Sequence, residues 1–260
     1  MIQGLSYCGQ LVRGQDPDRF LLSMFARADA REDLWALFAF NHEIAKTREV
    51  VSETQLGLIR LQWWRDAIEK IYEGEAPLEN EILPALAAAI QRHDLPKAHF
   101  DMLLHAREFD LEDVLPGNVE GLLNYADFTA TPLMKLAMRV TGREDDPVQP
   151  AAVNYALVGV LRAVPFHARQ RRCYLPEDLM QRHAQSVNQL YELKPADGLP
   201  EIVREVAEHA VMGVKCEDRM LKAMNRLAWI YLGQLKRCGY DVFHRKMSLE
   251  PAFKALRVLF

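Results

Sequence analysis

The sequence predicts an all-helical protein whose helices form a bundle around a single core. Apolar residues recur at the three- and four-residue spacings of helices, and the alternation that is typical of strands is hard to find. Glycine and proline together number 26 and lie mostly between these periodic segments, where they begin and end helices. With 260 residues, half of them hydrophobic, the chain can bury a full core, and we expect one domain over residues 1–260.

Capping signals mark the first helices. Asp16-Pro17 predicts a helix that begins with an aspartate cap and a proline in the first helical position, and a second helix should run from about Asp29 to Ile44. Ser52 to Gln55 has the form of a capping box, and the helix after it should end at Gly74. We expect the core-facing side of that helix to be an apolar stripe formed by Leu56, Ile59, Trp63, Ala67 and Ile71.

Further helices are bounded by proline, glycine, asparagine or serine. They are predicted around residues 80–92, 97–112, 119–140, 148–163, 200–224, 226–238 and 249–258. Pro132 lies inside one of them, so that helix should be kinked or broken there. Trp63 and Trp64 occupy neighbouring helical positions, so at most one of them can point into the core.

Composition excludes several function classes. A formal net charge of -4 lacks the positive excess that nucleic-acid binding needs. The four scattered cysteines predict free thiols in a reducing compartment.

The sequence also suggests where the protein acts. It contains no long apolar run and no targeting segment, so the expected location is the bacterial cytoplasm, with a peripheral inner-membrane contact allowed, or the mitochondrial matrix in a eukaryote. Residues 252–260 are basic and apolar, which favours packing on the bundle and, as an alternative, contact with a membrane surface or a partner.

In a helical bundle, two pairs of aspartates at i, i+4 can hold Mg²⁺ on a prenyl diphosphate. Asp29 and Asp33 have this spacing. They stand at a predicted helix start, with Glu32 three residues after Asp29 as in a capping box. Acidic residues in a first turn favour the helix dipole, so we interpret the pair as capping residues.

Several short segments carry a family resemblance. They are Leu34–Phe40, Trp63-Trp64, Leu122–Ala126, and Leu161-Arg162 followed by Arg172–Pro176. Together they resemble the squalene/phytoene synthase family, most clearly over about residues 20–185. The resemblance implies an isoprenoid-synthase-like helical bundle and, in active members, two aspartate motifs that bind Mg²⁺ and diphosphate.

Both aspartate motifs are missing from the positions that the resemblance assigns to them. Ala45, Lys46 and Glu49 stand at the first motif, and Ala163, Phe166 and His167 stand at the second. One carboxylate cannot build the oxygen-rich coordination that several Mg²⁺ ions require. Pro165 should also break the helix at the second motif. We therefore expect no catalytic residue, no metal site and no cofactor, with Mg²⁺ needed only if the chain is a synthase after all.

A basic cluster follows the second motif position. Its candidate anion-binding residues are Arg162, Arg169, Arg172 and Tyr174. The resemblance implies that the equivalents of Arg172 and Tyr174 help hold the diphosphate in synthases, so an anion site could survive here. The alternative is a solvated helix C-terminus whose cations complement the helix dipole.

The segments that contain the two altered motif positions carry a second resemblance. Asn41–Ala45 and Leu161–His167 resemble the complex I assembly factor branch of this family. That resemblance implies a pseudoenzyme that assists assembly of respiratory complex I, with complex I subunits or assembly proteins as partners. Two alternatives stay open: a prenyl transferase that uses Glu43, Glu49 and Glu53, and a module that binds an isoprenoid, lipid or quinone without turnover.

Overall fold

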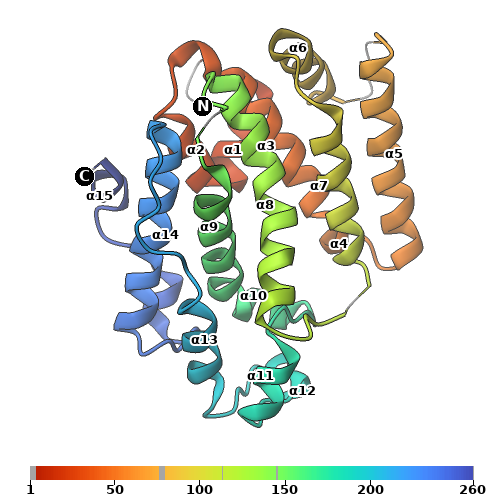
Figure 1. Ribbon diagram of the computed structural model, residues 1–260. Coiled ribbons are helices and arrows are strands. Elements are labelled where there is room, and N and C mark those ends of the chain that lie inside the picture. Colours follow the sequence, from red (N-terminus) through yellow and green to blue (C-terminus); the bar gives the residue numbers. More distant parts are fainter. Residues whose placement is uncertain (1–3, 76–79, 113, 145, 260) are drawn as a thin grey trace. The chain divides into compact units, whose positions relative to one another are not determined.

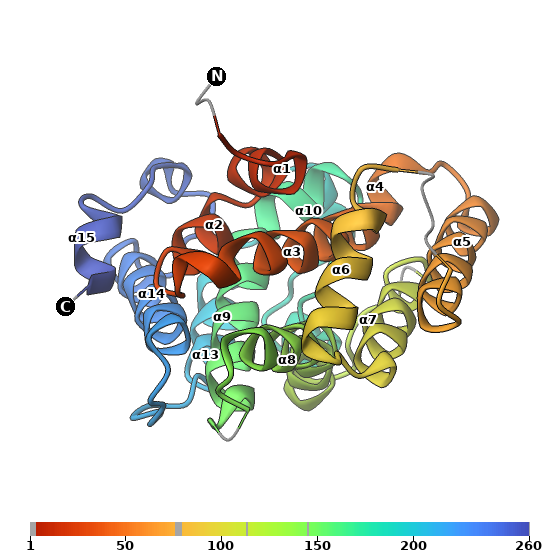
Figure 2. The same ribbon diagram turned by 90° about the horizontal axis from the view of Figure 1, so that it is seen from above.

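The computed structural model describes residues 4–75, 80–112, 114–144 and 146–259 (Figures 1 and 2). These ranges hold helices and turns and no strand, which confirms the all-helical prediction. None of the helices in them is both long and apolar enough to cross a bilayer. The helices are α1 (Tyr7–Gln15), α2 (Pro17–Ser23), η1 (Ala28–Ala30), α3 (Arg31–Ala45), α4 (Thr47–Val50), α5 (Thr54–Tyr72), α6 (Leu83–His93), α7 (Lys97–Phe109), α8 (Val119–Thr141), α9 (Val148–Arg162), α10 (Val164–Arg169), α11 (Glu177–Arg182), α12 (Val187–Tyr191), α13 (Leu199–Ala207), α14 (Arg219–Arg237), η2 (Arg245–Ser248) and α15 (Lys254–Leu259).

The helices group into two compact units, each assembled from separate stretches of the chain. Unit 1 comprises residues 1–112, 131–148 and 217–220, and unit 2 comprises residues 113–130, 149–216 and 221–260. Helix α8 passes from unit 2 into unit 1 beside Pro132 and runs through this proline without a break. The single domain over residues 1–260 stays a prediction.

Helix α3 is the centre of unit 1. It contacts α1, α2, α6 and α7, and the run Leu34–Phe40 is buried along its whole length. A helix that is apolar all round must be covered on every side, which is why four helices pack on it. The Phe40 ring meets Trp64 of α5 at 5.4 Å and Phe100 of α7 at 5.5 Å, both edge to face. On α1, Gly9 lies so close to Trp35 that an added Cβ would come within 2.8 Å of the ring.

Helix α5 turns a different face to the core than the sequence predicts. Ala67 and Ile71 are buried as expected, but Leu56, Ile59 and Trp63 are exposed. The buried face instead includes Gly57, Leu61, Trp64 and Ile68. Gly57 contributes to this choice of face, because the Leu111 side chain packs into the space where a Cβ would lie, 2.6 Å from the nearest Leu111 atom.

The capping box predicted for α5 does not form. The N-cap is Glu53 rather than Ser52, and no side chain caps the first turn. The Thr54 hydroxyl donates to the Leu111 carbonyl at 3.2 Å instead. A tertiary hydrogen bond thus takes the place of the local one.

Local signals set most other helix starts correctly. Asp16 caps α2, where it accepts from the Arg19 amide at 2.9 Å, and Pro17 is the first helical residue. The helices expected at 97–112, 119–140 and 148–163 are α7, α8 and α9. The short helices α1, α4, α10, α11 and α12 lie outside the predicted ranges.

The two helices predicted at 200–224 and 226–238 are wrong in their boundaries. Helix α13 already ends at Ala207, and α14 then runs without interruption from Arg219 to Arg237. Asn225, which suggests a break between two helices, lies inside α14 and accepts from the Asn154 amide of α9 at 3.1 Å. Asn154 also exchanges two hydrogen bonds with the backbone of Val211, at 2.8 and 2.9 Å. This buried side chain ties together three separate segments of unit 2.

Candidate functional site

The positions of the first family motif lie in unit 1, where α3 ends and α4 begins. Ala45 is the last residue of α3, Lys46 lies between the helices, and Glu49 is exposed on α4. One turn earlier, the largely buried Glu43 carboxylate accepts from Lys46 Nζ at 2.5 Å and from Arg60 Nη2 at 2.8 Å. The charge of this carboxylate is therefore balanced by two cations that belong to the protein.

The His42 side chain lies beside these groups, and its surroundings disfavour the protonated ring. Burial lowers its pKa below the ordinary value of 6.5, and the nearby Lys46 lowers it further. The ring is therefore neutral at physiological pH, and it adds no charge to the Glu43 ion pairs.

The positions of the second family motif lie in unit 2, at a break between two helices. Helix α9 ends at Arg162, Ala163 is the N-cap of α10, and Pro165 occupies the first turn of α10. This confirms that Pro165 ends the longer helix. Phe166 is about half exposed, and the His167 ring packs edge-on against Tyr174 with ring centres 4.8 Å apart.

Around Tyr174 the structure gathers an aromatic cluster with one arginine. The Tyr174 ring stacks on Tyr125 of α8 at 5.0 Å, and its hydroxyl accepts from Arg172 Nη2. Arg172 is buried and also donates to Gln170 Oε1 at 3.4 Å. Arg171 just before it has a φ of +55°, which turns the chain so that the Arg172 amide bonds the His167 carbonyl at 2.9 Å. Two of the four candidate anion-binding residues therefore form a direct pair.

The other two candidates have different settings. The Arg162 guanidinium carbon lies 3.3 Å from the centre of the Tyr231 ring of α14, whereas Arg169 is exposed at the end of α10. Next to Arg172, burial raises the pKa of the Cys173 thiol to about 11. All four cysteines are reduced and outside any disulfide, as predicted.

Magnesium, which the family resemblance implies for active members, does not fit these residues. Across the described ranges, no group of three or more histidine, cysteine, aspartate or glutamate side chains could hold a metal ion. At the second motif the side chains are a methyl group, a phenyl ring and an imidazole, while Mg²⁺ prefers carboxylate and phosphate oxygens.

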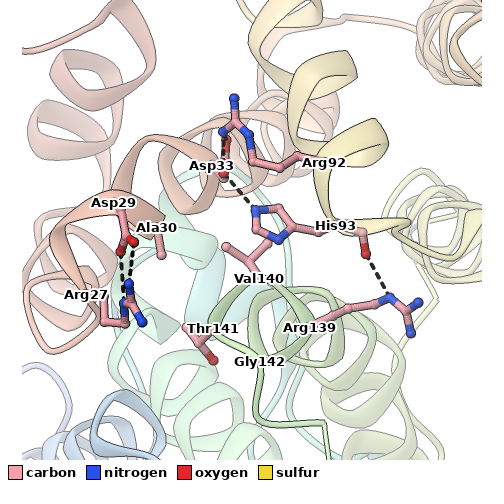
Figure 3. Close-up of a pocket in the computed structure, with 10 residues that line it drawn as sticks. All are labelled: Arg27, Asp29, Ala30, Asp33, Arg92, His93, Arg139, Val140, Thr141 and Gly142. Carbon is pink, nitrogen blue, oxygen red and sulfur yellow. Dashed lines mark hydrogen bonds and ion pairs between the residues drawn. The ribbon is translucent and has the colours of Figure 1, made fainter.

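Unit 1 contains a polar pocket to which no sequence pattern points. It has a volume of about 510 Å³ and is lined from η1, α3, α6 and the end of α8 (Figure 3). Asp33 lies in its wall, almost fully buried, and accepts from Arg92 Nη1 at 2.6 and 2.7 Å and from His93 Nε2 at 2.8 Å. Arg139 donates to the His93 carbonyl at 3.0 Å.

The interpretation of the aspartate pair is confirmed in part: Asp33 lies in the first turn of α3, as the helix-dipole argument predicts, but neither aspartate caps this helix. The N-cap of α3 is Ala30 and no side chain caps it, while Asp33 bonds across to α6. Asp29 pairs with Arg27 at the surface, and the hydrogen bond from Arg27 holds its pKa below the usual value. The partners of Asp33 are 59 and 60 residues away along the chain, and no local pattern points to them.

Comparison with known proteins identifies the family to which this fold belongs. Residues 12–252 match the squalene/phytoene synthase family, and the chain belongs to that family. Among its relatives, NADH dehydrogenase (ubiquinone) complex I, assembly factor 6 of Bos taurus is 29% identical over 263 residues, which cover 94% of this chain and 79% of the relative. A phytoene synthase of Thermus thermophilus is 28% identical over 264 residues, which cover 95% of this chain and 88% of the relative. The solved structure of a dehydrosqualene synthase with its ligand shares the fold, with a TM-score of 0.78 at 17% identity over 97% of this chain and 93% of that chain.

Proposed function

We propose that this protein assists the assembly of respiratory complex I and has kept the synthase fold without its prenyl-transfer chemistry. The relatives named as complex I assembly factors support the first part, because their similarity extends over almost the whole chain. The side chains at the two motif positions support the second part. The protein's partners would be complex I subunits or other assembly proteins, met at the cytoplasmic face of a bacterial membrane.

The observation that carries the loss of chemistry is the pairing of Glu43 with Lys46 and Arg60. A metal that ionises a diphosphate must be held by several oxygen ligands and must polarise the leaving group. Glu43, Lys46 and Arg60 together carry a net charge of +1, so the two bound cations repel a metal ion from this carboxylate, and Lys46 cannot act as the missing metal.

A prenyl transferase is the second candidate, because the phytoene synthase relative is nearly as similar as the assembly factors. In that case Glu43, Glu49 and Glu53 would have to supply the metal ligands. The buried Arg172–Tyr174 pair favours this candidate, because the family resemblance implies that the equivalent residues of synthases help hold the diphosphate. A lipid- or quinone-binding module without turnover remains a third hypothesis.

Two experiments separate these functions. Affinity purification of the tagged chain from its native cells, followed by mass spectrometry, should recover complex I subunits or assembly proteins, and deletion of the gene should lower the amount of assembled complex. Complementation with Glu49→Ala should restore complex I as well as the unaltered gene does. A deletion strain with normal complex I, together with a purification free of its subunits, would rule out the assembly role.

The purified protein is then incubated with farnesyl and geranylgeranyl diphosphate, with and without Mg²⁺. We expect no condensed product under either condition. A Mg²⁺-dependent product that disappears in Glu49→Ala would return the chain to the synthases. Metal-independent binding without product, lost in Arg172→Ala, would instead support a surviving anion site.

A further inference from the structure

One part of unit 2 carries a charge opposite to that of the whole chain. Residues 221–259 contain eight lysines and arginines and two acidic residues, a formal charge of +6 in a chain whose net charge is -4. They form most of α14, all of η2 and all of α15, and the α14 portion has no acidic residue. Figures 1 and 2 show α14 and α15 side by side.

The cations of this region are mostly on the outside. Six of the exposed ones are Lys222, Lys236, Arg237, Arg245, Lys246 and Arg257. Of the two acidic residues, Glu250 is paired with Lys254 at 2.8 Å, and Asp241 accepts from the Phe243 amide at 2.9 Å. The positive charges are therefore not cancelled by carboxylates of the same region.

The same stretch of the chain carries large exposed apolar side chains. Phe253 is 78% exposed, Leu256 53% and Leu259 55%. Phe253 has a φ of +55°, in the left-handed region that a bulky side chain rarely adopts, at the point where α15 begins. Phe253, Leu256 and Leu259 are spaced three residues apart, and exposed apolar side chains of this size favour an interaction site.

The segment that carries these apolar groups is held firmly from its other side. Val258 is fully buried, and Arg226 of α14 donates to the carbonyls of Val258 and Leu259 at 3.3 and 3.0 Å. Farther along α14, Gln234 donates to the carbonyls of Lys246 and Leu249 at 2.7 and 2.9 Å. The bonds from Arg226 hold α15 against α14, and those from Gln234 hold η2 and Leu249 there, while Phe253, Leu256 and Leu259 stay exposed.

We propose that this surface, formed by the six exposed cations and by Phe253, Leu256 and Leu259, binds an anionic lipid bilayer. The cations would lie at the headgroups, and the three apolar side chains would enter the interface beneath them. Basic residues near an anionic leaflet and inserted apolar side chains both contribute to the free energy of membrane binding. Either feature alone gives only weak binding. A duplex nucleic acid would use the charges but has no place for the three apolar side chains. The proposal does not depend on the role in complex I assembly.

The test is co-sedimentation of the full chain with phosphatidylcholine vesicles that contain or lack phosphatidylglycerol. We expect binding only to the anionic vesicles, with weaker binding as salt is added. The triple variant Lys222→Gln, Lys236→Gln, Lys246→Gln should bind about a hundredfold more weakly, since each basic residue near the surface contributes about fivefold. Phe253→Ser with Leu256→Ser should also weaken binding at unchanged charge.

Matched controls come from exposed residues elsewhere in the chain. Lys70→Gln with Lys135→Gln and Arg143→Gln removes as many charges from unit 1, and Met212→Ser removes an exposed apolar side chain from another part of unit 2. All variants should give the circular dichroism spectrum of the unaltered chain. The proposal is overturned by equal losses in test and control variants, by binding that ignores the lipid charge, or by full retention of binding in Phe253→Ser with Leu256→Ser. It is also overturned if duplex DNA competes with the vesicles and binds the serine variant undiminished.

Discussion

The guanidinium of Arg162 lies over the face of the Tyr231 ring, 3.3 Å from its centre, and joins the end of α9 to α14. A cation held against a buried ring is stabilised by the negative charge of the ring face, by about 2 kcal/mol where water is excluded. Tyr231→Leu should therefore lower the free energy of unfolding by about that amount. Tyr231→Phe keeps the ring face and should cost clearly less. Urea denaturation of both variants measures the difference, and equal losses would show that the cation–ring contact contributes nothing.

Asp33 should matter for stability in a way that Asp29 does not. Asp33→Asn leaves the exposed Arg92 and the partly buried His93 facing a neutral, almost fully buried side chain, and we expect a loss of about 2 kcal/mol in the free energy of unfolding. Asp29→Asn removes only an exposed pair with Arg27 and should change stability little. Chemical denaturation of the two variants side by side tests this. Similar effects would mean that the two carboxylates are equivalent after all.

The adjacent tryptophans of α5 give a matched pair for core packing. Trp64 is 1% exposed and touches Phe40, whereas Trp63 is 39% exposed. Trp64→Ala should cost about 4 kcal/mol through lost burial and the cavity it leaves. Trp63→Ala should cost no more than about 1 kcal/mol. If Trp64→Ala fails to fold, Trp64→Phe, measured by thermal denaturation, should still be less stable than Trp63→Phe.

Acid should destabilise the protein through two half-buried histidines, His42 and His99. Burial lowers the pKa of His42, with help from Lys46, and burial lowers the pKa of His99, with help from Lys135. The unfolded chain therefore takes up protons more readily than the folded one, so stability is full above pH 6.5 and declines as the pH falls through that value toward the lowered pKa. Melting temperatures between neutral pH and about pH 5 should fall less in His42→Gln with His99→Gln than in the unaltered chain. A parallel fall in both proteins would exclude these two side chains as the cause.

Local chemistry made several parts of the fold predictable. Asp16 and Pro17 determine where α2 begins, because a cap and a fixed φ act within a few residues. Pro165 determines where α9 ends for the same reason. The family resemblance located the Arg172–Tyr174 pair, although its burial and its contact with Tyr125 came only from the structure.

The remaining features depend on contacts between distant residues. The face that α5 buries depends on Gly57 meeting Leu111, and α14 continues through Asn225 because Asn154 bonds to it from another helix. The pocket around Asp33 needs α6 to bring Arg92 and His93 against α3. Helical periodicity and capping rules describe short segments, so none of these arrangements can be derived from them.

The interleaving of the two units along the chain has a consequence for biosynthesis. Unit 1 needs residues 217–220, and unit 2 begins with residues 113–130 but is complete only with residues 221–260. During translation, neither unit can acquire all of its native contacts until nearly the whole polypeptide has left the ribosome. Nascent chains that stop short of α14 therefore expose apolar surface of both units at once, which makes them clients for chaperones and proteases rather than partly active fragments.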